Sequence, residues 1–216
     1  MADRVTEILA RPGFRLVRLQ GGGSLKLPLA LFKRHPLQEG EAVNAGEYRR
    51  RLSAEEARFA LEQAARLLER RDRTCRWMEG ELLRRGFSAE ASGGAVDSLL
   101  RLGYLDDRRY AQNALSRLEK SLGVMQIRRR LLSDGVPEGL LRELLDRLDP
   151  GPSGDAALKL AQKSLRSSMK LDARARYRRA FAALARRGFP PDTARGAIEK
   201  ALSLQGDGPG AGDEAG

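Results

Sequence analysis

A spaced series of glycine turns constrains this chain more than any other feature. Three segments each run from a helical pattern through a glycine into the next helical pattern: LLRRGFSAEASGGAVDSLL (82–100), LLSDGVPEGLLRELLDRL (131–148) and LARRGFPPDTARGAIEKAL (184–202). Their glycines are Gly86, Gly135 and Gly188. A glycine just past a helix end adopts the left-handed conformation, and an apolar residue after it folds back onto the helix. The series predicts a mainly α protein built from tandem repeats of three helices, about fifty residues each.

The repeats divide the chain into segments with predictable boundaries. We expect helical repeats over 54–103, 104–149 and 155–205, in an elongated arrangement. The sequence Ser53-Ala54-Glu55-Glu56 has the capping-box pattern and predicts the start of the first repeat. Proline and glycine crowd residues 150–154, so we expect a short linker there that no helix continues through and that can act as a hinge. The glycine-rich tail, 206–216, is expected to be disordered.

Residues 1–53 follow a different pattern. Apolar and polar residues alternate over 5–9, 14–19 and 24–29, which predicts three short strands, with Gly21–Gly23 as a turn. A short helix is expected at Leu29–His35, followed by a loop through Gly40 and Gly46. Because a sheet this small is marginal alone, we expect this strand-containing segment to pack on the helical part.

Charge is concentrated near the ends of the predicted folded part. The chain has 40 basic and 29 acidic residues, a net charge of +11 and an isoelectric point near 10.5. Residues 150–205 alone contain twelve basic and four acidic residues. Such an excess implies an anionic partner, either nucleic acid or an acidic protein surface. Arginines near helix ends also complement the helix dipole, which accounts for part of the excess.

The arginines that we expect to contact the partner all lie in the second and third repeats. They are Arg128, Arg129, Arg130, Arg174, Arg176, Arg178, Arg179, Arg186 and Arg187. Guanidinium groups bind phosphate and carboxylate in a forked geometry, which suits either kind of partner.

Two adjacent carboxylates, Asp106 and Asp107, raise the question of catalysis. A metal-dependent nuclease would need further ligands converging on them, and no spaced ligand set is recognisable. Gly103 ends one helix, and Asp106 then occupies the N-cap position of the next helix, with Asp107 in its first turn. Tyr104 and Leu105 are expected to pack onto Tyr110 and Ala111 as a hydrophobic staple. We therefore interpret the pair as helix-starting residues and keep the nuclease as a distant alternative.

The other residues with reactive side chains give no catalytic pattern. His35 is the only histidine and Cys75 the only cysteine. Cys75 follows Thr74 near a helix start, where the pKa of its thiol could be lowered, but without a paired histidine a structural role is favoured. No phosphate-binding loop, nucleophile elbow or zinc-binding pattern occurs. The sequence predicts a protein that is not an enzyme and that has no cofactor or metal.

The sequence also favours a compartment. A single cysteine fits a reducing environment. The N-terminus has no signal-peptide pattern, and no apolar stretch reaches 18 residues. We expect a cytoplasmic monomer without membrane contact.

The run LGYLDDRRYA (102–111) resembles the hallmark segment of the bacterial RecX regulatory-protein family, and LLRRGF (82–87) resembles the segment that precedes it. The similarity covers about 54–203 and includes the three tandem three-helix units. The third unit departs from the pattern, since it has SSMKLDARARY (167–177) in place of GYLDD, with a helix start expected at Asp172. The glycines within SGG (92–94) also fall inside a predicted helix, where each costs about 1 kcal/mol.

The resemblance implies a regulatory function. Members of that family bind the RecA recombinase and its nucleoprotein filament, usually as inhibitors of ATP hydrolysis, strand exchange and co-protease activity, and some contact DNA. The partners expected here are thus the RecA filament and single-stranded DNA, reached through the filament or bound weakly alone. The alternative is a basic helical protein that acts directly on DNA, because glycine turns between short helices also occur in helix-turn-helix proteins. A sequence-specific DNA reader would bind one duplex sequence tightly without RecA, whereas a RecA modulator would bind bare DNA weakly.

Overall fold

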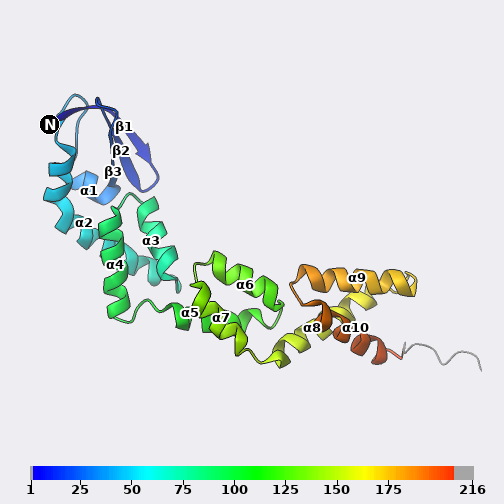
Figure 1. Cartoon of the computed structure of the whole chain (residues 1–216). Coiled ribbons are helices and arrows are strands. Elements are labelled where there is room, and N and C mark those ends of the chain that lie inside the picture. Colours follow the sequence, from blue (N-terminus) through cyan, green and yellow to red (C-terminus); the bar gives the residue numbers. More distant parts are fainter. Residues whose placement is uncertain (1, 207–216) are drawn as a thin grey trace, which may run out of the picture. The chain divides into compact units, whose positions relative to one another are not determined.

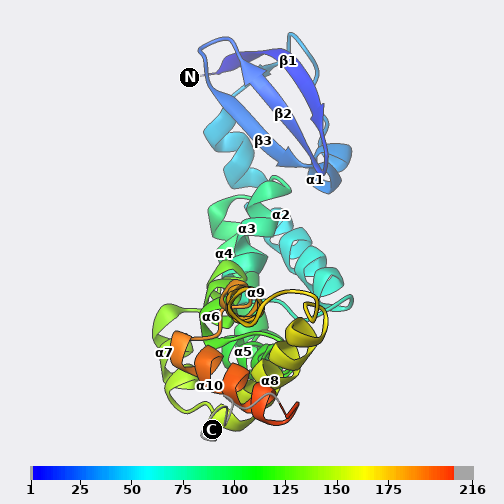
Figure 2. The same cartoon turned by 90° about the vertical axis from the view of Figure 1, so that its right-hand side faces the viewer.

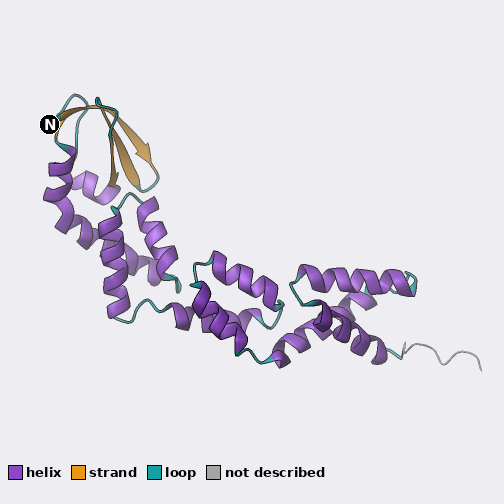
Figure 3. Ribbon diagram, in the orientation of Figure 1, coloured by secondary structure: helices purple, strands orange, loops and turns teal. Residues whose placement is uncertain are grey.

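The computed structural model describes residues 2–206, and within them the chain forms four strands and ten helices (Figures 1 and 3). It divides into two compact units, the first ending at Asp107 and the second beginning at Arg108. The protein is mainly α, with a small strand-containing segment at the N-terminus, as the sequence predicts. None of the described helices is long and apolar enough to cross a membrane.

The first unit begins with a small antiparallel sheet in the order β3-β2-β1-β4, whose long strands lie side by side in Figure 2. The strands are β1 (Asp3–Arg11), β2 (Phe14–Leu19), β3 (Ser24–Pro28) and β4 (Ala42–Val43). The three predicted strands are confirmed. The two-residue β4 was predicted as loop, and it pairs with the start of β1.

The helices of the first unit cover the sheet and then form a core of their own. They are α1 (Leu29–Arg34), α2 (Ala45–Leu68), α3 (Cys75–Arg84) and α4 (Ala89–Arg101). Leu31 of α1 and Tyr48 and Leu52 of α2 join the buried face of the sheet. The second half of α2 packs with α3 and α4 around Met78 and Leu82, which are fully buried.

Helix α2 begins at Ala45, nine residues before the start predicted at Ala54. Asn44 is its N-cap, and the Asn44 side chain accepts a hydrogen bond from the Glu47 backbone N–H at 3.2 Å. The capping-box interpretation of Ser53 was wrong, because Ser53 lies inside the helix and its hydroxyl donates to the Arg50 carbonyl. The buried stripe of α2 begins at Tyr48 and Leu52 and explains the earlier start. Burial of these two residues on the sheet extends the helix toward the N-terminus, so that it includes Gly46.

The second unit contains six helices in two groups of three. They are α5 (Asp107–Leu118, of which Asp107 belongs to the first unit), α6 (Val124–Ser133), α7 (Glu138–Asp146), α8 (Pro150–Arg166), α9 (Ala173–Arg186) and α10 (Pro191–Ser203). The first group is packed around Ile127, Leu131 and Leu141, and the second around Leu165, Leu184 and Ile198. The predicted grouping of the helices in threes is confirmed.

The predicted linker over 150–154 is wrong, because α8 begins at Pro150. The Asp149 side chain caps the helix by accepting from the Gly151 N–H at 3.0 Å. Proline costs nothing in a first helical turn, where its missing N–H would have no partner within the helix. The buried Ala156 and Ala157 follow directly and hold the start of the helix on its core. The expected disorder of the tail concerns residues that lie almost entirely outside the described part.

Gly93 and Gly94 lie inside α4, and a Cβ at either position would meet nothing within 4 Å. We expect Gly93→Ala and Gly94→Ala each to raise the free energy of unfolding by about 0.5–1 kcal/mol, because alanine restricts the unfolded chain and favours the helix. Urea denaturation of the full chain measures the change. Gly103→Ala is the matched control, since Gly103 ends the same helix at φ +73° and its replacement is expected to destabilise the protein. Equal effects at all three positions would contradict the explanation.

Candidate functional site

Helix α9 is the most basic element of the described chain. Between Ala173 and Gly188 there are six arginines and no acidic residue. Asp172 caps the helix by accepting from the Ala175 N–H at 2.8 Å, which confirms the helix start expected there. Ala180 and Leu184 are fully buried and fix one side of α9 on the core of the third repeat. The remaining sides carry the arginines.

Four of these arginines form an exposed set that we name the α9 arginine face: Arg174, Arg178, Arg179 and Arg186. Arg174 and Arg178 are one helical turn apart, and Arg179 and Arg186 are two turns apart, so each pair lies along one line of the helix. None of the four makes a side-chain hydrogen bond or an ion pair within residues 2–206. Their charges are therefore not neutralised by the described part of the chain.

The other predicted contact residues are placed differently. Arg128 pairs with Glu138 at 2.6 Å and Arg130 with Asp134 at 3.4 Å, so their charges are balanced locally. The Arg187 guanidinium donates to the Ser121 carbonyl at 3.3 Å. Arg176 is half-buried, and Arg129 is exposed on α6 without an ion pair to any described residue. Of the nine predicted residues, the structure thus brings four together on one helix with unbalanced charge.

The glycine turns are confirmed in detail. Gly86, Gly103, Gly135 and Gly188 have φ between +73° and +98°, the left-handed region. At each one the glycine N–H and the next N–H bond back to carbonyls of the last turn, as in Gly188 to Ala185 and Phe189 to Leu184. The residue after the glycine is buried at Phe87, Val136 and Phe189. Tyr104 is the exception, since 64% of it is exposed.

Gly188 also forms a joint between the second and third repeats, and this joint was not predicted. The backbone N–H groups of Gly123 and Met125, at the start of α6, donate to the carbonyls of Arg187 and Gly188 at 2.9 and 3.1 Å. The Gln126 side chain donates to the Arg186 carbonyl at 3.1 Å. The positive end of α6 thus meets the negative end of α9, and each helix caps the other.

Gly86 has a comparable position in the first unit. A Cβ on Gly86 would lie 2.6 Å from Phe14 Cβ and 3.2 Å from the Pro28 backbone N. The Lys26 ammonium, on β3, donates to the Leu83 carbonyl near the end of α3. The first glycine turn therefore rests on the sheet, which explains how the strand-containing segment packs on the helices.

Asp107 has a structural task that its sequence position does not reveal. Helix α5 begins at Asp107, so Asp106 directly precedes the helix. The Asp107 carboxylate accepts a hydrogen bond from the Cys75 backbone N–H at 2.8 Å and so satisfies the first residue of α3. Leu105 is buried in the core of the first unit and not in the core that contains Ala111, so the predicted staple is wrong for Leu105. Within residues 2–206, no three His, Cys, Asp or Glu side chains are grouped to hold a metal ion.

Burial, and next the negative charge of Asp107, raise the pKa of the Cys75 thiol to about 12. The lowered pKa considered from the helix start is wrong, because burial and the adjacent carboxylate outweigh the helix dipole. We expect Cys75 to react slowly with iodoacetamide at pH 8, since the thiolate is the nucleophile. Asp107→Asn should lower the pKa of this thiol and speed the reaction, as followed by mass spectrometry over a range of pH. An unchanged pH profile in that variant would contradict the role given to the Asp107 charge.

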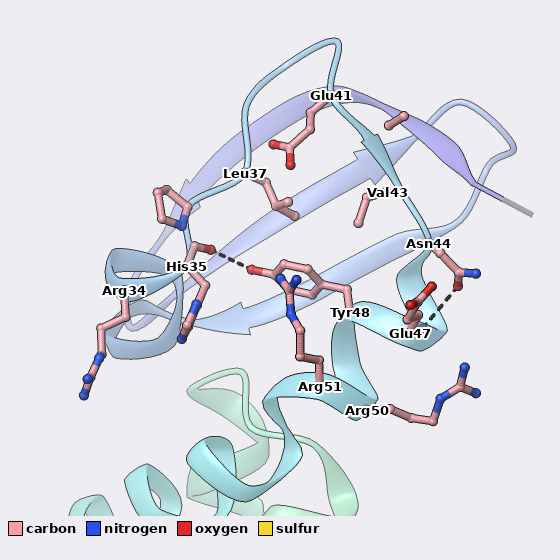
Figure 4. A pocket seen from close by; sticks show the side chains of 12 residues that line it. Arg34, His35, Leu37, Glu41, Val43, Asn44, Glu47, Tyr48, Arg50 and Arg51 are labelled. Atoms are coloured by element: carbon pink, nitrogen blue, oxygen red, sulfur yellow. Dashed lines mark hydrogen bonds between the residues drawn. The ribbon is translucent and has the colours of Figure 1, made fainter.

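The first unit contains a cavity of about 850 Å³ beside β4 and the start of α2 (Figure 4). Its polar groups are largely occupied with one another. The Tyr48 hydroxyl donates to the His35 carbonyl at 2.6 Å, and the Arg51 guanidinium lies 5.6 Å from the centre of the Tyr48 ring. Basic side chains such as Arg50 and Arg51 line the cavity together with the acidic Glu41 and Glu47, so its charge is mixed. We therefore regard the α9 arginine face as the stronger candidate site.

His35 takes part in a cluster of charged side chains at the edge of this cavity. Its Nε2 lies 2.7 Å from Glu55 Oε2, and Arg34 Nε lies 3.0 Å from Glu55 Oε1. The hydrogen bond with His35, and next the charge of Arg34, lower the pKa of the Glu55 carboxyl group. These contacts tie α1 to α2 and give His35 a structural role.

The sequence interpretation also missed a buried carboxylate at the start of α4 and an aromatic groove beside α9. Glu56 is buried, and its carboxylate accepts from the Ser88 N–H at 2.7 Å, at the N-cap of α4. Tyr177 and Phe181 line an open groove with Arg178. The spacing of four residues between the two aromatic side chains was the available signal for the groove.

Comparisons with known proteins agree with this architecture. Residues 155–198, which span most of α8, all of α9 and most of α10, match the family model "RecX, third three-helix domain". A solved structure described as regulatory protein RecX superposes with a TM-score of 0.63 over 92% of this chain and 99% of its own, at 19% identity. RecX from Lactobacillus salivarius gives a TM-score of 0.65 over 70% of this chain and 99% of its own, at 18% identity. At these identities the structures establish the fold.

Sequence relatives extend the comparison to the family. The chain is 33% identical over 143 residues to "Regulatory protein RecX" of Trichlorobacter lovleyi, covering 63% of this chain and 92% of the relative. The protein of the same name from Prosthecochloris aestuarii is 30% identical over 154 residues, covering 70% of this chain and 99% of the relative. With the three-helix repeats, the glycine turns and these relatives taken together, the chain belongs to the RecX family of regulatory proteins.

Proposed function

We propose that this protein binds the RecA recombinase and its nucleoprotein filament and inhibits RecA ATP hydrolysis, strand exchange and co-protease activity. Membership of the RecX family supports a regulatory role, and the family resemblance supports RecA as the partner. The observation that carries the proposal is the α9 arginine face, where four exposed guanidinium groups have no acidic partner within the described residues. Such a surface fits DNA phosphates of the filament or acidic patches on the recombinase.

The proposed mechanism is non-catalytic. The joint at Gly123 and Gly188 links the second and third repeats through backbone hydrogen bonds, so α6 and α9 present their exposed residues from one connected body. Contacts with neighbouring protomers of a filament would combine several weak contacts into a stronger attachment. Arg129, exposed on α6, would then add to the α9 arginine face within the same unit.

The RecA ATPase assay on single-stranded DNA tests the proposal. The expected result is a decrease in the rate of ATP hydrolysis as the protein is added up to stoichiometric amounts. Adding the protein before and after the filament has assembled separates a block of growth from disassembly. An unchanged rate at stoichiometric amounts would overturn the proposed function. A protein that acts on DNA directly would instead bind one duplex sequence tightly in the absence of RecA.

A further inference from the structure

An open groove of about 350 Å³ lies beside α9 in the third repeat. Tyr177, Arg178, Phe181 and Ala182 of α9 line it, together with Arg195 of α10. The groove combines two aromatic rings with two guanidinium groups, and this combination differs from the purely charged surface of the α9 arginine face. A volume of this size admits a group as large as one nucleotide.

The two aromatic rings that line the groove are stacked in nearly parallel planes. Tyr177 and Phe181 are one helical turn apart, their ring centres are 6.4 Å apart, and their planes differ by only 13°. In a stacked pair each ring has one face that the other ring does not cover. One side of each ring packs against the core around Leu184, and both residues remain half-buried. Their positions are thus fixed by the fold while part of each ring stays accessible.

The charges around the rings are almost all positive. Arg178 lies between the two rings in the sequence and lines the groove, and Arg174 is one turn earlier on the same helix. Arg195 reaches the groove from α10, and its nearest acidic partner, Asp192, is 3.5 Å away and 97% exposed. Asp192 balances part of the Arg195 charge, whereas Arg178 has no ion pair within residues 2–206, so the groove keeps a net positive charge. The groove is therefore suited to a ligand that is both anionic and planar.

We infer that this groove binds one nucleotide of a single-stranded nucleic acid, with a base stacked on Tyr177 or Phe181 and the adjoining phosphates held by Arg178 and Arg195. Aromatic platforms beside basic grooves bind single strands with little sequence preference. In a duplex the base faces are covered by neighbouring base pairs, so the rings favour a single strand. An acidic peptide would satisfy the guanidinium groups but leave the ring faces unused. The inference rests on the proposed function only in one respect: a protein that binds the RecA filament comes close to the single-stranded DNA on which the filament forms.

Direct binding by the full chain, without recombinase, tests the inference. We would measure the fluorescence anisotropy of a labelled oligothymidylate of about 12 nucleotides and of an abasic oligomer with the same number of phosphates. Loss of stacking on one base is expected to weaken binding of the abasic oligomer by roughly 10-fold. The variants Tyr177→Leu and Phe181→Leu keep apolar contact with the core and should weaken binding of the oligothymidylate by a similar factor. Arg142→Ala, an exposed arginine on α7, is the matched control and should change little.

Two results would overturn the inference. The first is equal affinity of the unaltered chain for the two oligomers, which would mean that charge alone accounts for binding. This comparison needs no variant, so it remains decisive if a leucine variant fails to fold. The second is displacement of the oligothymidylate by poly-glutamate together with unchanged binding by folded leucine variants, which would favour an acidic protein partner. Inhibition of the RecA ATPase by the unaltered chain in either case would leave the proposed function standing.

Discussion

Replacing the four residues of the α9 arginine face by glutamate is expected to weaken inhibition of the RecA ATPase by about 100-fold. Each exposed charge contact contributes about 0.7 kcal/mol, and four such contacts sum to about 3 kcal/mol, which is a factor of about 100 in affinity. Reversal adds repulsion to the loss of contact, so the estimate is a lower bound. The measurement is the concentration of protein that halves the rate of ATP hydrolysis on single-stranded DNA.

The structure provides sharp controls for this experiment. Arg128→Glu and Arg130→Glu change charges that are balanced by Glu138 and Asp134, so they test whether any change of charge has the same effect. Arg142→Glu changes an exposed arginine outside the predicted set. Arg176 and Arg187 are left intact, because Arg176 is half-buried and Arg187 contacts the Ser121 carbonyl. Undiminished inhibition by a folded fourfold variant would remove the α9 arginine face from the mechanism.

The interaction should also depend strongly on salt. Exposed charges separated by more than about 8 Å are screened at physiological ionic strength, so added salt weakens a contact made by several arginines. The fourfold glutamate variant should therefore lose most of the salt dependence of inhibition together with its strength. A salt dependence equal to that of the unaltered protein would mean that other charges make the contact.

The second large effect is expected from Gly188→Ala. A Cβ at Gly188 would lie 2.4 Å from the Gln126 backbone N, and the residue has φ +79°. The left-handed conformation costs alanine about 1–2 kcal/mol, and displacement of α6 would remove hydrogen bonds worth about 1 kcal/mol each. We expect a total loss of roughly 3–5 kcal/mol in the free energy of unfolding, measured by urea denaturation.

Gly103→Ala separates the two causes of that loss. Gly103 has φ +73°, but a Cβ there would meet nothing within 4 Å, so only the conformational cost of about 1–2 kcal/mol applies. Hydrogen exchange gives a second readout, since the amides of Gly123 and Met125 should exchange faster in Gly188→Ala because they lose their carbonyl acceptors. Equal destabilisation by the two variants, with both amides still protected, would show that the joint contributes little.

The joint also illustrates how a local sequence signal differs from a tertiary one. The left-handed glycine past α9 follows from the local pattern ARRGF, because the turn is closed by hydrogen bonds within a few residues. Gly123 precedes α6 without any side-chain cap of its own. Its cap is supplied by carbonyls more than sixty residues away, and no local pattern contains that information.

Helix starts also depend partly on local sequence and partly on tertiary contacts. Asp172 and Ser88 are N-caps whose side chains bond three residues ahead, and their residue types predict them. The pattern at Ser53 has equally suitable residue types, yet α2 runs through it because Tyr48 and Leu52 are buried on the sheet. At Pro150 the residues that suggest a break are compatible with a first helical turn, and the buried alanines that follow hold that turn in place.

The sequence by itself determined the three-helix repeats, the glycine turns, the three main strands and the basic character of the third repeat, because these depend on periodicity, on left-handed glycine and on residue charge. Only the tertiary structure decided which charges remain unbalanced, since Glu138 and Asp134 neutralise Arg128 and Arg130 while nothing in the described chain neutralises the α9 arginine face. It also decided the raised pKa of Cys75, which depends on burial and on Asp107 from another helix. Burial and ion pairing join residues far apart in the sequence, and they are fixed only when the helices pack.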